Sequence, residues 1–240
     1  MNWLIENIKT LLYAAIIAII IRSLLVQPFY IPSSSMEPTL LVGDRLFVTK
    51  FTYGYSKHSF PFSPPIYNKR ILFKEVNRGD VIVFKTPADN RTDYIKRIIG
   101  MPGDIIQFLD GNLYINNIQV LKTIKTKNQK LYCGPNQINV NTYEEKLPNN
   151  KKYLASYRTD VSFQNSKKFK VPENHYFFLG DNRDCSKDSR YSEVGFVNKL
   201  NLVGKAQILF FSSNPRIGSI FNFTKWNESI RLKRFLKKIL

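Results

Sequence analysis

Two segments of the sequence carry residue types that together could perform nucleophilic chemistry. Three consecutive serines, ending at Ser35, stand between two prolines in the segment 31–40 (IPSSSMEPTL), and Lys96 stands in the segment 94–104 (YIKRIIGMPGD). A serine hydroxyl becomes an effective nucleophile only when a neighbouring base removes its proton. A lysine can be that base if burial lowers its pKa from about 10.4 towards neutrality. The pair is a candidate Ser–Lys dyad, although either segment alone could be an ordinary loop or an exposed strand edge.

A polar loop is the third segment whose residue types could take part in chemistry. Residues 180–190 (GDNRDCSKDSR) directly follow the apolar run 175–179 (HYFFL). Paired charges in loops are usually structural. So many carboxylates and arginines directly after a core strand nevertheless indicate that the loop supports a functional site.

Rival catalytic groups are scarce in the sequence. The only histidines are His58, in a proline-rich segment, and His175, at the start of an apolar run, which disfavours a Ser–His–Asp triad. The sequence has no HExxH motif, paired histidines or CxxC spacing, so we expect no metal and no cofactor. Cys133 and Cys185 are expected to be free thiols, with a single bridge as the alternative in an oxidising compartment.

The elements that must position these groups are predicted to be β-strands. Aromatic residues make up 14% of the chain, and rings pack well on pleated surfaces. On the strand around Lys96, that side chain would point to the face opposite Ile95 and Arg97. A hairpin is expected with Asp110-Gly111 as its tight turn. The predicted extended segments are 45–50, 80–85, 94–99, 105–120, 175–179 and 202–211.

The N-terminal region predicts a membrane anchor. Residues 11–21 (LLYAAIIAIII) are uncharged and apolar, and a shorter apolar run follows Arg22. A bilayer core needs about 20 apolar helical residues, and Pro28 would end the helix. A small-x-small cleavage site does not follow the run, so we expect an uncleaved signal-anchor. The charges at Glu6, Lys9 and Arg22 do not fix its orientation.

The chain is strongly basic, with 36 Lys and Arg against 18 Asp and Glu and a formal net charge of +18. This charge favours anionic partners, and we expect anionic lipid rather than nucleic acid because the sequence has no nucleic-acid-reading motif. Residues 230–240 (IRLKRFLKKIL) predict a basic amphipathic helix, either on a membrane surface or packed on the domain. Residues 56–69 are expected to form an exposed proline-rich loop.

Together these segments resemble type I signal peptidases in order, spacing and local sequence. The resemblance rests on IPSSSMEPTL, RLFVTKF, GDVIVF, YIKRIIGMPGD and GDNRDCSKDSR, in that order. It covers residues 29–50, 79–111 and 171–211, and includes the single N-terminal anchor. At Cys185 the chain departs from the family, which usually has Asn there.

The resemblance implies a mainly antiparallel β catalytic domain, interrupted by an inserted β-rich subdomain and preceded by one transmembrane helix. The fold of the insert is not predictable from its weak periodicity. The expected division of the chain is 1–28 for the cytoplasmic tip and anchor, 29–121 and 171–240 for the two parts of the catalytic domain, and 122–170 for the insert.

The resemblance also implies roles for individual residues. Ser35 would be the nucleophile and Lys96 the general base. The Ser33 hydroxyl and the Ser35 backbone N–H would form the oxyanion hole. In the polar loop, Ser186 would orient Lys96 by a hydrogen bond. Residues that would brace the site through ion pairs are Asp181, Asp188 and Arg190.

The implied activity is that of a membrane-bound serine endopeptidase that removes signal peptides from exported preproteins at small-x-small sites, typically Ala-x-Ala. Its catalytic domain would lie on the outer face of the cytoplasmic membrane. Expected partners are signal peptides, anionic membrane lipid and the protein translocation machinery. Two alternatives remain: a related Ser–Lys peptidase, either dedicated to one exported substrate or a self-cleaving repressor, and a non-enzymatic anchored β-domain. Self-cleaving repressors lack an anchor and carry a DNA-binding domain, which this chain does not favour.

Overall fold

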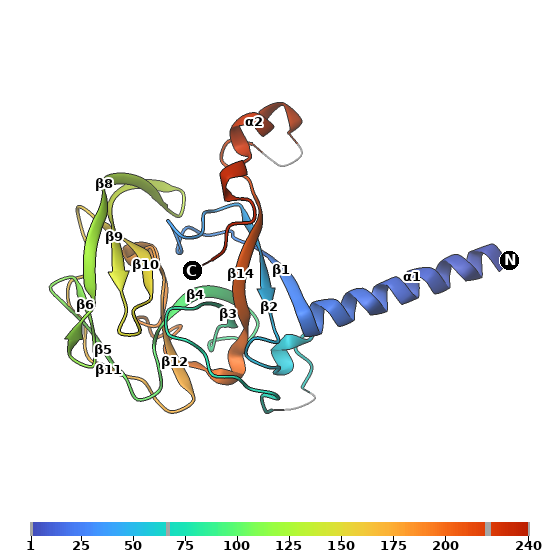
Figure 1. Cartoon of the computed structure of the whole chain (residues 1–240), viewed down its shortest axis with the longest axis horizontal. Helices are drawn as coiled ribbons and strands as arrows, with labels where there is room; N and C mark the ends of the chain where they lie inside the picture. The colour runs from blue at the N-terminus through green and yellow to red at the C-terminus, as the bar shows by residue number, and fades with distance from the viewer. Residues whose placement is uncertain (1, 66–67, 219–221, 240) are drawn as a thin grey trace.

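A long N-terminal helix projects from a β-rich body in the computed structural model, which describes residues 2–65, 68–218 and 222–239 (Figure 1). Helix α1 (Asn2–Ile20) continues into the π-helical segment η1 (Ile21–Leu25). The segment Trp3–Leu25 is long and apolar enough to cross a membrane. The side chains of residues 3–22 are all exposed, so this apolar surface has no protein partner within the described chain. The predicted anchor is therefore a candidate membrane span.

The main sheet has seven antiparallel strands in the order β1-β2-β14-β3-β4-β12-β13. Each segment predicted to be extended in this part of the chain is a strand, because its β-branched and aromatic side chains fill the cores on the two sides of the sheet. The strands are β1 (Val26–Tyr30), β2 (Asp44–Thr49), β3 (Val81–Lys85), β4 (Asp93–Gly100), β12 (His175–Leu179), β13 (Val197–Asn198) and β14 (Leu202–Ser212).

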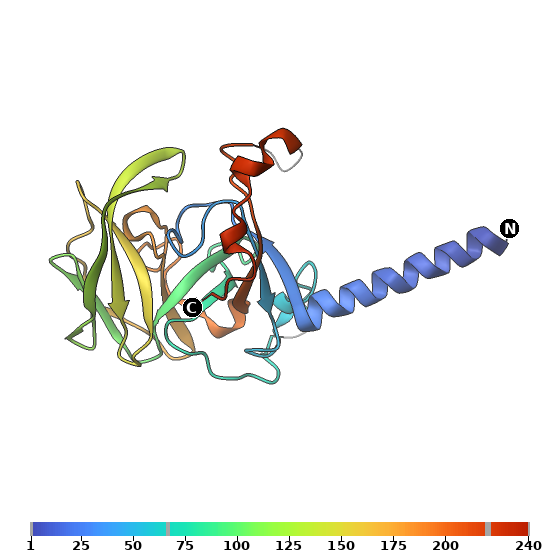
Figure 2. The same ribbon diagram turned by 45° about the horizontal axis from the view of Figure 1, so that its top comes forward.

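Two smaller sheets lie on the side of the body away from α1 (Figures 1 and 2). The predicted hairpin is confirmed, with Asp110 and Gly111 both at positive φ as a tight turn requires. One sheet has the order β11-β5-β6-β7 and the other β10-β9-β8. Their bounds are β5 (Ile105–Leu109), β6 (Asn112–Ile115), β7 (Ile118–Gln119), β8 (Leu121–Cys133), β9 (Asn136–Lys146), β10 (Lys152–Arg158) and β11 (Phe169–Lys170).

The predicted mainly antiparallel β fold is confirmed, and residues 122–170 are β-rich. Side chains from both smaller sheets share one core with Ile99 of β4 and with Phe177 and Leu179 of β12. The domain boundaries at 121/122 and 170/171 stay a prediction. For the site, this shared core matters because it fixes the smaller sheets against β4 and β12.

The prediction of a basic amphipathic helix at 230–240 is wrong for the described residues up to 239. Arg234 donates hydrogen bonds of 3.0 and 2.6 Å to the buried carboxylate of Asp44. The Leu209 N–H donates to the Lys237 carbonyl, and the Ile239 N–H donates to the Gln207 carbonyl, so the segment lies along β14. These long-range contacts override the local helical pattern. Leu240 lies outside the described residues.

The remaining helical elements are single turns. The proline-rich segment 56–69 was expected to be exposed, but Ser56, His58 and Ser59 are buried in it; residues 66 and 67 lie outside the described chain. The short helices are α2 (Trp226–Ser229), η2 (Lys57–Ser59), η3 (Arg183–Cys185), η4 (Lys199–Asn201), η5 (Phe223–Lys225) and η6 (Leu232–Arg234).

Candidate active site

The three serines lie in the loop that joins β1 to β2. Ile31, Met36 and Leu40 of this loop are buried in the core beneath the main sheet, and they anchor the loop on both sides of the serines. Ser35 is 7% exposed, whereas Ser33 is exposed. Apolar burial thus fixes the loop and presents the serine hydroxyls at the surface of the core.

Lys96 reaches this loop from β4. Its Nζ donates a hydrogen bond of 2.6 Å to Ser35 Oγ, across 61 residues of sequence. The lysine is 4% exposed. Burial lowers the pKa of Lys96 from 10.5 to about 8, against the opposing effect of the Asp188 and Asp181 carboxylates. About a tenth of the amine is therefore neutral at pH 7, and in that form Nζ can accept the Ser35 proton.

Ser33 lies close enough to contribute to the same site. Its Oγ is 3.3 Å from Ser35 Oγ, so the two hydroxyls face one side of the loop. A pocket of about 600 Å³ opens beside them. Its walls combine apolar side chains with the dyad, and they include Phe29, Tyr30, Ile31, Ser33, Ser35, Val83, Tyr94, Ile95, Lys96 and Cys185.

The predicted bracing residues form buried ion pairs. Asp181 (1% exposed) accepts hydrogen bonds of 2.8 and 2.7 Å from Arg97 (0% exposed). Asp188 accepts 2.8 Å from Nε of Arg190, and the Gly180 N–H donates 3.0 Å to the same carboxylate. Both carboxylates raise the pKa of Lys96, and the Arg190 guanidinium acts in the opposite direction.

The hydrogen bond predicted between Ser186 and Lys96 is absent. The Ser186 hydroxyl is buried and has no hydrogen-bond partner among the described residues. It packs instead against Gly180, where an added Cβ would lie 2.2 Å from Ser186 Oγ and 2.5 Å from the Ser35 carbonyl oxygen. The Ser186 side chain thus adjoins the loop that carries Ser35, whereas Lys96 Nζ donates its hydrogen bond directly to Ser35 Oγ.

Comparisons with known proteins show which family this chain belongs to. A family model described as signal peptidase, peptidase S26, matches residues 4–211. Signal peptidase I of Rickettsia typhi is 38% identical over 252 residues, covering 98% of this chain and 93% of that protein. The chain belongs to the signal peptidase family, peptidase S26. Signal peptidase I of Rickettsia prowazekii is 39% identical over 240 residues, covering 93% of this chain and 89% of that protein.

A solved structure of a signal peptidase I from Enterococcus faecalis V583 is 27% identical, with a TM-score of 0.33, and the match covers 55% of this chain and 97% of that chain. The signal peptidase match to residues 4–211 spans the loop that carries Ser35, β4 and the polar loop 180–190. The resemblance found in the sequence is therefore confirmed at the level of the family.

Two buried arginines behind the site, Arg97 and Arg183, were not predicted from the sequence. Arg97 holds Asp181, and its only sequence signal is its place next to Lys96 on the opposite face of β4. Deeper in the body, the buried Arg183 guanidinium forms hydrogen bonds of 2.8 and 2.6 Å with Glu145 of β9. The Tyr153 and Tyr157 hydroxyls donate to the same carboxylate at 2.5 Å each.

The expectation of two free thiols is wrong. Cys133, at the end of β8, and Cys185, in the polar loop, form a disulfide with their Cα atoms 5.3 Å apart. The two residues are 52 positions apart in sequence, and the hairpin β8–β9 brings one next to the other. Sequence alone could not decide between thiols and a bridge, because their distance depends on how that hairpin folds over the polar loop.

A Ser–His pair occurs elsewhere in this signal peptidase and does not form a triad. His58 Nδ1 lies 2.9 Å from Ser63 Oγ. Burial and the nearby cations lower the pKa of His58 to about 4. In the part of the chain that the structure describes, no carboxylate bonds to this histidine. The pair lines a separate cavity of about 410 Å³ with Lys50 and Arg22.

Proposed function

We propose that this chain is a membrane-anchored serine endopeptidase that removes signal peptides, with Ser35 as nucleophile and Lys96 as general base. The observation that carries the proposal is the 2.6 Å contact between a buried lysine Nζ and Ser35 Oγ in a member of the signal peptidase family. A serine paired with a lysine of lowered pKa is the arrangement that Ser–Lys hydrolysis needs.

The proposed mechanism begins with neutral Lys96. As Ser35 Oγ attacks the scissile carbonyl carbon, its proton passes to Nζ. The Ser35 N–H and the Ser33 hydroxyl hold the developing oxyanion. The Lys96 ammonium then gives its proton to the leaving amine, which leaves an ester on Ser35. Lys96, neutral again, takes a proton from a water that attacks the ester. As the bond between the acyl carbon and Ser35 Oγ breaks, Lys96 returns that proton to Oγ and the acyl product leaves.

The pocket supports an extended peptide as the substrate. Among the described residues, β1 pairs with β2 alone in its sheet, so its other edge offers backbone groups that a peptide strand can bond. The chain runs from this edge strand directly to Ser33 and Ser35. The dyad lies within an apolar-walled pocket that suits small uncharged side chains next to the cut bond. We therefore propose exported preproteins with small-x-small sites as substrates.

The proposed location is the outer face of the cytoplasmic membrane. Ser35 lies only ten residues after Leu25, the end of the candidate span, so the site would work near the membrane surface. Signal peptides emerge there as apolar helices. Anionic lipid and the translocation machinery are proposed partners. The net charge of +18 favours anionic lipid, although Arg231 and Arg234 already face Asp44.

One cleavage assay distinguishes the proposed signal peptidase from a peptidase with one dedicated substrate and from a non-enzymatic domain. Full-length protein in detergent micelles should cut a purified preprotein between the signal peptide and the mature chain, as sequencing of the new N-terminus will show. Cleavage of one dedicated substrate among many preproteins would favour the specialised peptidase. No cleavage of any preprotein would favour the non-enzymatic anchored domain.

Replacing Ser33 by alanine is expected to lower kcat by about 10²–10³-fold with little change in KM, because an oxyanion donor acts mainly in the transition state. Steady-state kinetics on a preprotein measure both constants. Ser33 is exposed, so the fold should persist. Ser33→Thr, which keeps a hydroxyl, should retain more activity than Ser33→Ala. A change in KM alone would make Ser33 a binding residue.

The activity should rise with pH through the pKa of Lys96. Since burial lowers that pKa to about 8, kcat/KM should increase about tenfold per pH unit below pH 8 and level off above it. The sign follows because only the neutral amine can accept the Ser35 proton. A pH–rate profile of the full chain measures this.

Lys50 provides a matched control for the pH profile. Burial lowers its pKa to about 8 as well, but its Nζ donates to the Ser59 carbonyl and not to Ser35. The Lys50→Met variant should therefore keep the rising limb unchanged. Loss of the limb in this variant would assign the titration to Lys50 and contradict the role of Lys96.

A further inference from the structure

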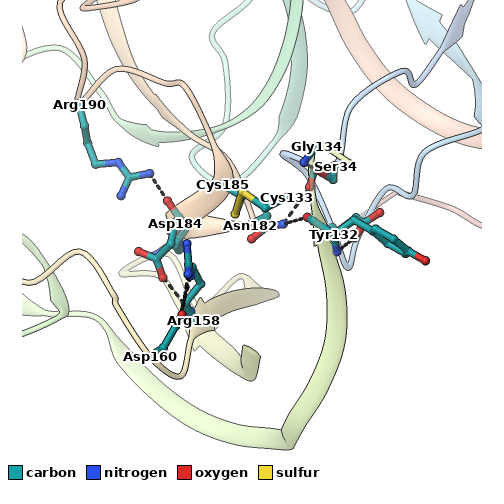
Figure 3. The surroundings of a disulfide bond; sticks show 12 residues. Ser34, Tyr132, Cys133, Gly134, Arg158, Asp160, Asn182, Asp184, Cys185 and Arg190 are labelled. Atoms are coloured by element: carbon teal, nitrogen blue, oxygen red, sulfur yellow. Dashed lines mark hydrogen bonds and ion pairs between the residues drawn. A yellow bond between two sulfur atoms is a disulfide. The ribbon is translucent and has the colours of Figure 1, made fainter. Parts of the chain in front are cut away.

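We propose that the tip of the β8–β9 hairpin, residues 132–134, is a positioning element for Ser35, and that the Cys133–Cys185 disulfide fixes it in place. This inference rests on the proposed function and identifies what holds the nucleophile at its working position. Figure 3 shows the tip, the disulfide and the polar loop together.

The tip binds the loop between β1 and β2 that carries Ser35, here called the nucleophile loop, on both sides of Ser35. The Gly134 N–H donates 3.1 Å to the hydroxyl of Ser34, the residue before the nucleophile. The Tyr132 N–H donates 3.0 Å to the carboxylate of Glu37, two residues after it. Ser34 and Glu37 are both buried. Two backbone donors of the tip thus hold the short segment that carries Ser35.

Asn182 of the polar loop joins the tip to the same segment. Its Nδ2 donates 3.1 Å to the Ser34 carbonyl and 2.9 Å to the Tyr132 carbonyl. Its backbone N–H donates 3.1 Å to the carbonyl of Ser35 itself. Three segments far apart in sequence therefore meet around the nucleophile, and the fully buried Asn182 side chain lies between two of them (Figure 3).

The disulfide provides the covalent link in this cluster. Cys185 lies three residues after Asn182 and lines the pocket that contains Lys96. Cys133 lies between the two residues whose N–H groups bind the nucleophile loop. Most side chains of β8 from 123 to 130 are exposed, and Leu131 is the one buried apolar residue of β8 next to the tip. A hairpin end with few buried contacts opens easily unless something ties it down.

Arg216 contacts the tip from its other side. The guanidinium lies 3.7 Å from the centre of the Tyr132 ring, and it donates 2.9 Å to the Gly134 carbonyl. Arg216 is exposed, so this contact alone is weaker than one made in the core. The disulfide is consequently the contact that we expect to dominate the placement of the tip.

Loss of the tip should affect the chemical step more than substrate binding. A displacement of about 1 Å in a reacting group can cost about 10²-fold in rate. Half of the residues that line the pocket belong to β1, β3 and β4, which the main sheet holds in place; most of the others belong to the loop that carries Ser35 and to the polar loop. We therefore expect a lower rate constant for acylation with a nearly unchanged KM.

The test is the full-length Cys133→Ala/Cys185→Ala variant in detergent micelles, assayed on a preprotein under single-turnover conditions with saturating enzyme. Under these conditions the rate constant does not depend on the fraction of active molecules. We expect a loss of about 10- to 100-fold, KM within about twofold, and the pH midpoint of the wild type. Dithiothreitol, which reduces the bridge to two thiols as it oxidises to its own disulfide, should slow the wild type equally. It should not slow the variant further.

A control distinguishes positioning from stability. Leu113→Ala opens a cavity in the core of the smaller sheets, away from the tip. It should lower the midpoint of thermal unfolding but leave the single-turnover constant unchanged. If the double cysteine variant does not fold, Ser34→Ala removes the acceptor of the Gly134 N–H and should slow the same step.

Two outcomes contradict the inference. If the double variant and reduced wild type lose thermal stability but keep the wild-type rate constant, the disulfide is only a structural cross-link. If the wild type cleaves no preprotein, the proposed function fails, and this inference fails with it. If the wild type is active and the variants are equally fast, only the positioning role is rejected, and the proposed function stands.

Discussion

The Ser35→Ala and Lys96→Met variants are each expected to lower kcat by about 10⁴-fold or more, since the two groups act as one unit in the chemical step. Alanine removes the attacking oxygen. Methionine keeps the length and volume of Lys96 without an amine. Because the lysine is 4% exposed, an apolar replacement should not disturb the fold. Cleavage kinetics of a purified preprotein measure the loss, and far-UV circular dichroism checks the fold.

The Lys96→Arg variant tests whether the neutral amine, rather than the positive charge, is needed at this position. Arginine retains a positive charge but cannot lose a proton at accessible pH, so it should be as inactive as methionine at every pH. The double variant Ser35→Ala/Lys96→Met should be no slower than either single variant. Substantial turnover in a folded single variant would remove that residue from the dyad.

Asp181→Ala is expected to lower the free energy of unfolding by about 3–5 kcal/mol, because it leaves the Arg97 guanidinium buried without its carboxylate. Both side chains of this pair are at most 1% exposed. Thermal or urea unfolding of the detergent-solubilised chain measures the change. The same substitution removes a carboxylate that raises the pKa of Lys96, so the rising limb of the pH–rate profile should move to lower pH.

Two variants test the cause of that loss. Asp160→Ala breaks the exposed pair with Arg158 and should leave the unfolding midpoint unchanged, since solvent screens it. Arg97→Met/Asp181→Leu removes both charges and should recover much of the lost stability. If Asp181→Ala were as stable as the wild type, the buried pair would not brace the site.

The electrostatics of the site result from two opposed effects. Burial favours the neutral amine of Lys96, whereas Asp188 and Asp181 favour the ammonium. Arg190, which is bonded to Asp188, acts with burial, and the pKa of Lys96 stays at about 8. A general base works best when its pKa lies near the working pH. If Lys96 is the base, as proposed, Arg190 contributes to its reactivity without a hydrogen bond to Ser35.

Local sequence determined much of this protein. The apolar run before Pro28 determined the long N-terminal helix, and short runs of β-branched and aromatic side chains determined strands such as β3 and β4. The order and spacing of the serine cluster, YIKR and the polar loop determined the family and the candidate dyad. Each of these signals depends on residues close together in the chain, where periodicity and motif spacing are informative.

Only the tertiary structure decided how distant segments meet. It joined Cys133 to Cys185, turned residues 230–239 from the predicted helix into a segment held by Asp44, and left Ser186 without the expected bond to Lys96. The physical reason is the same in each case. A disulfide, a buried ion pair or a hydrogen bond depends on distances set by the packing of whole sheets, and local propensity is too weak to predict them.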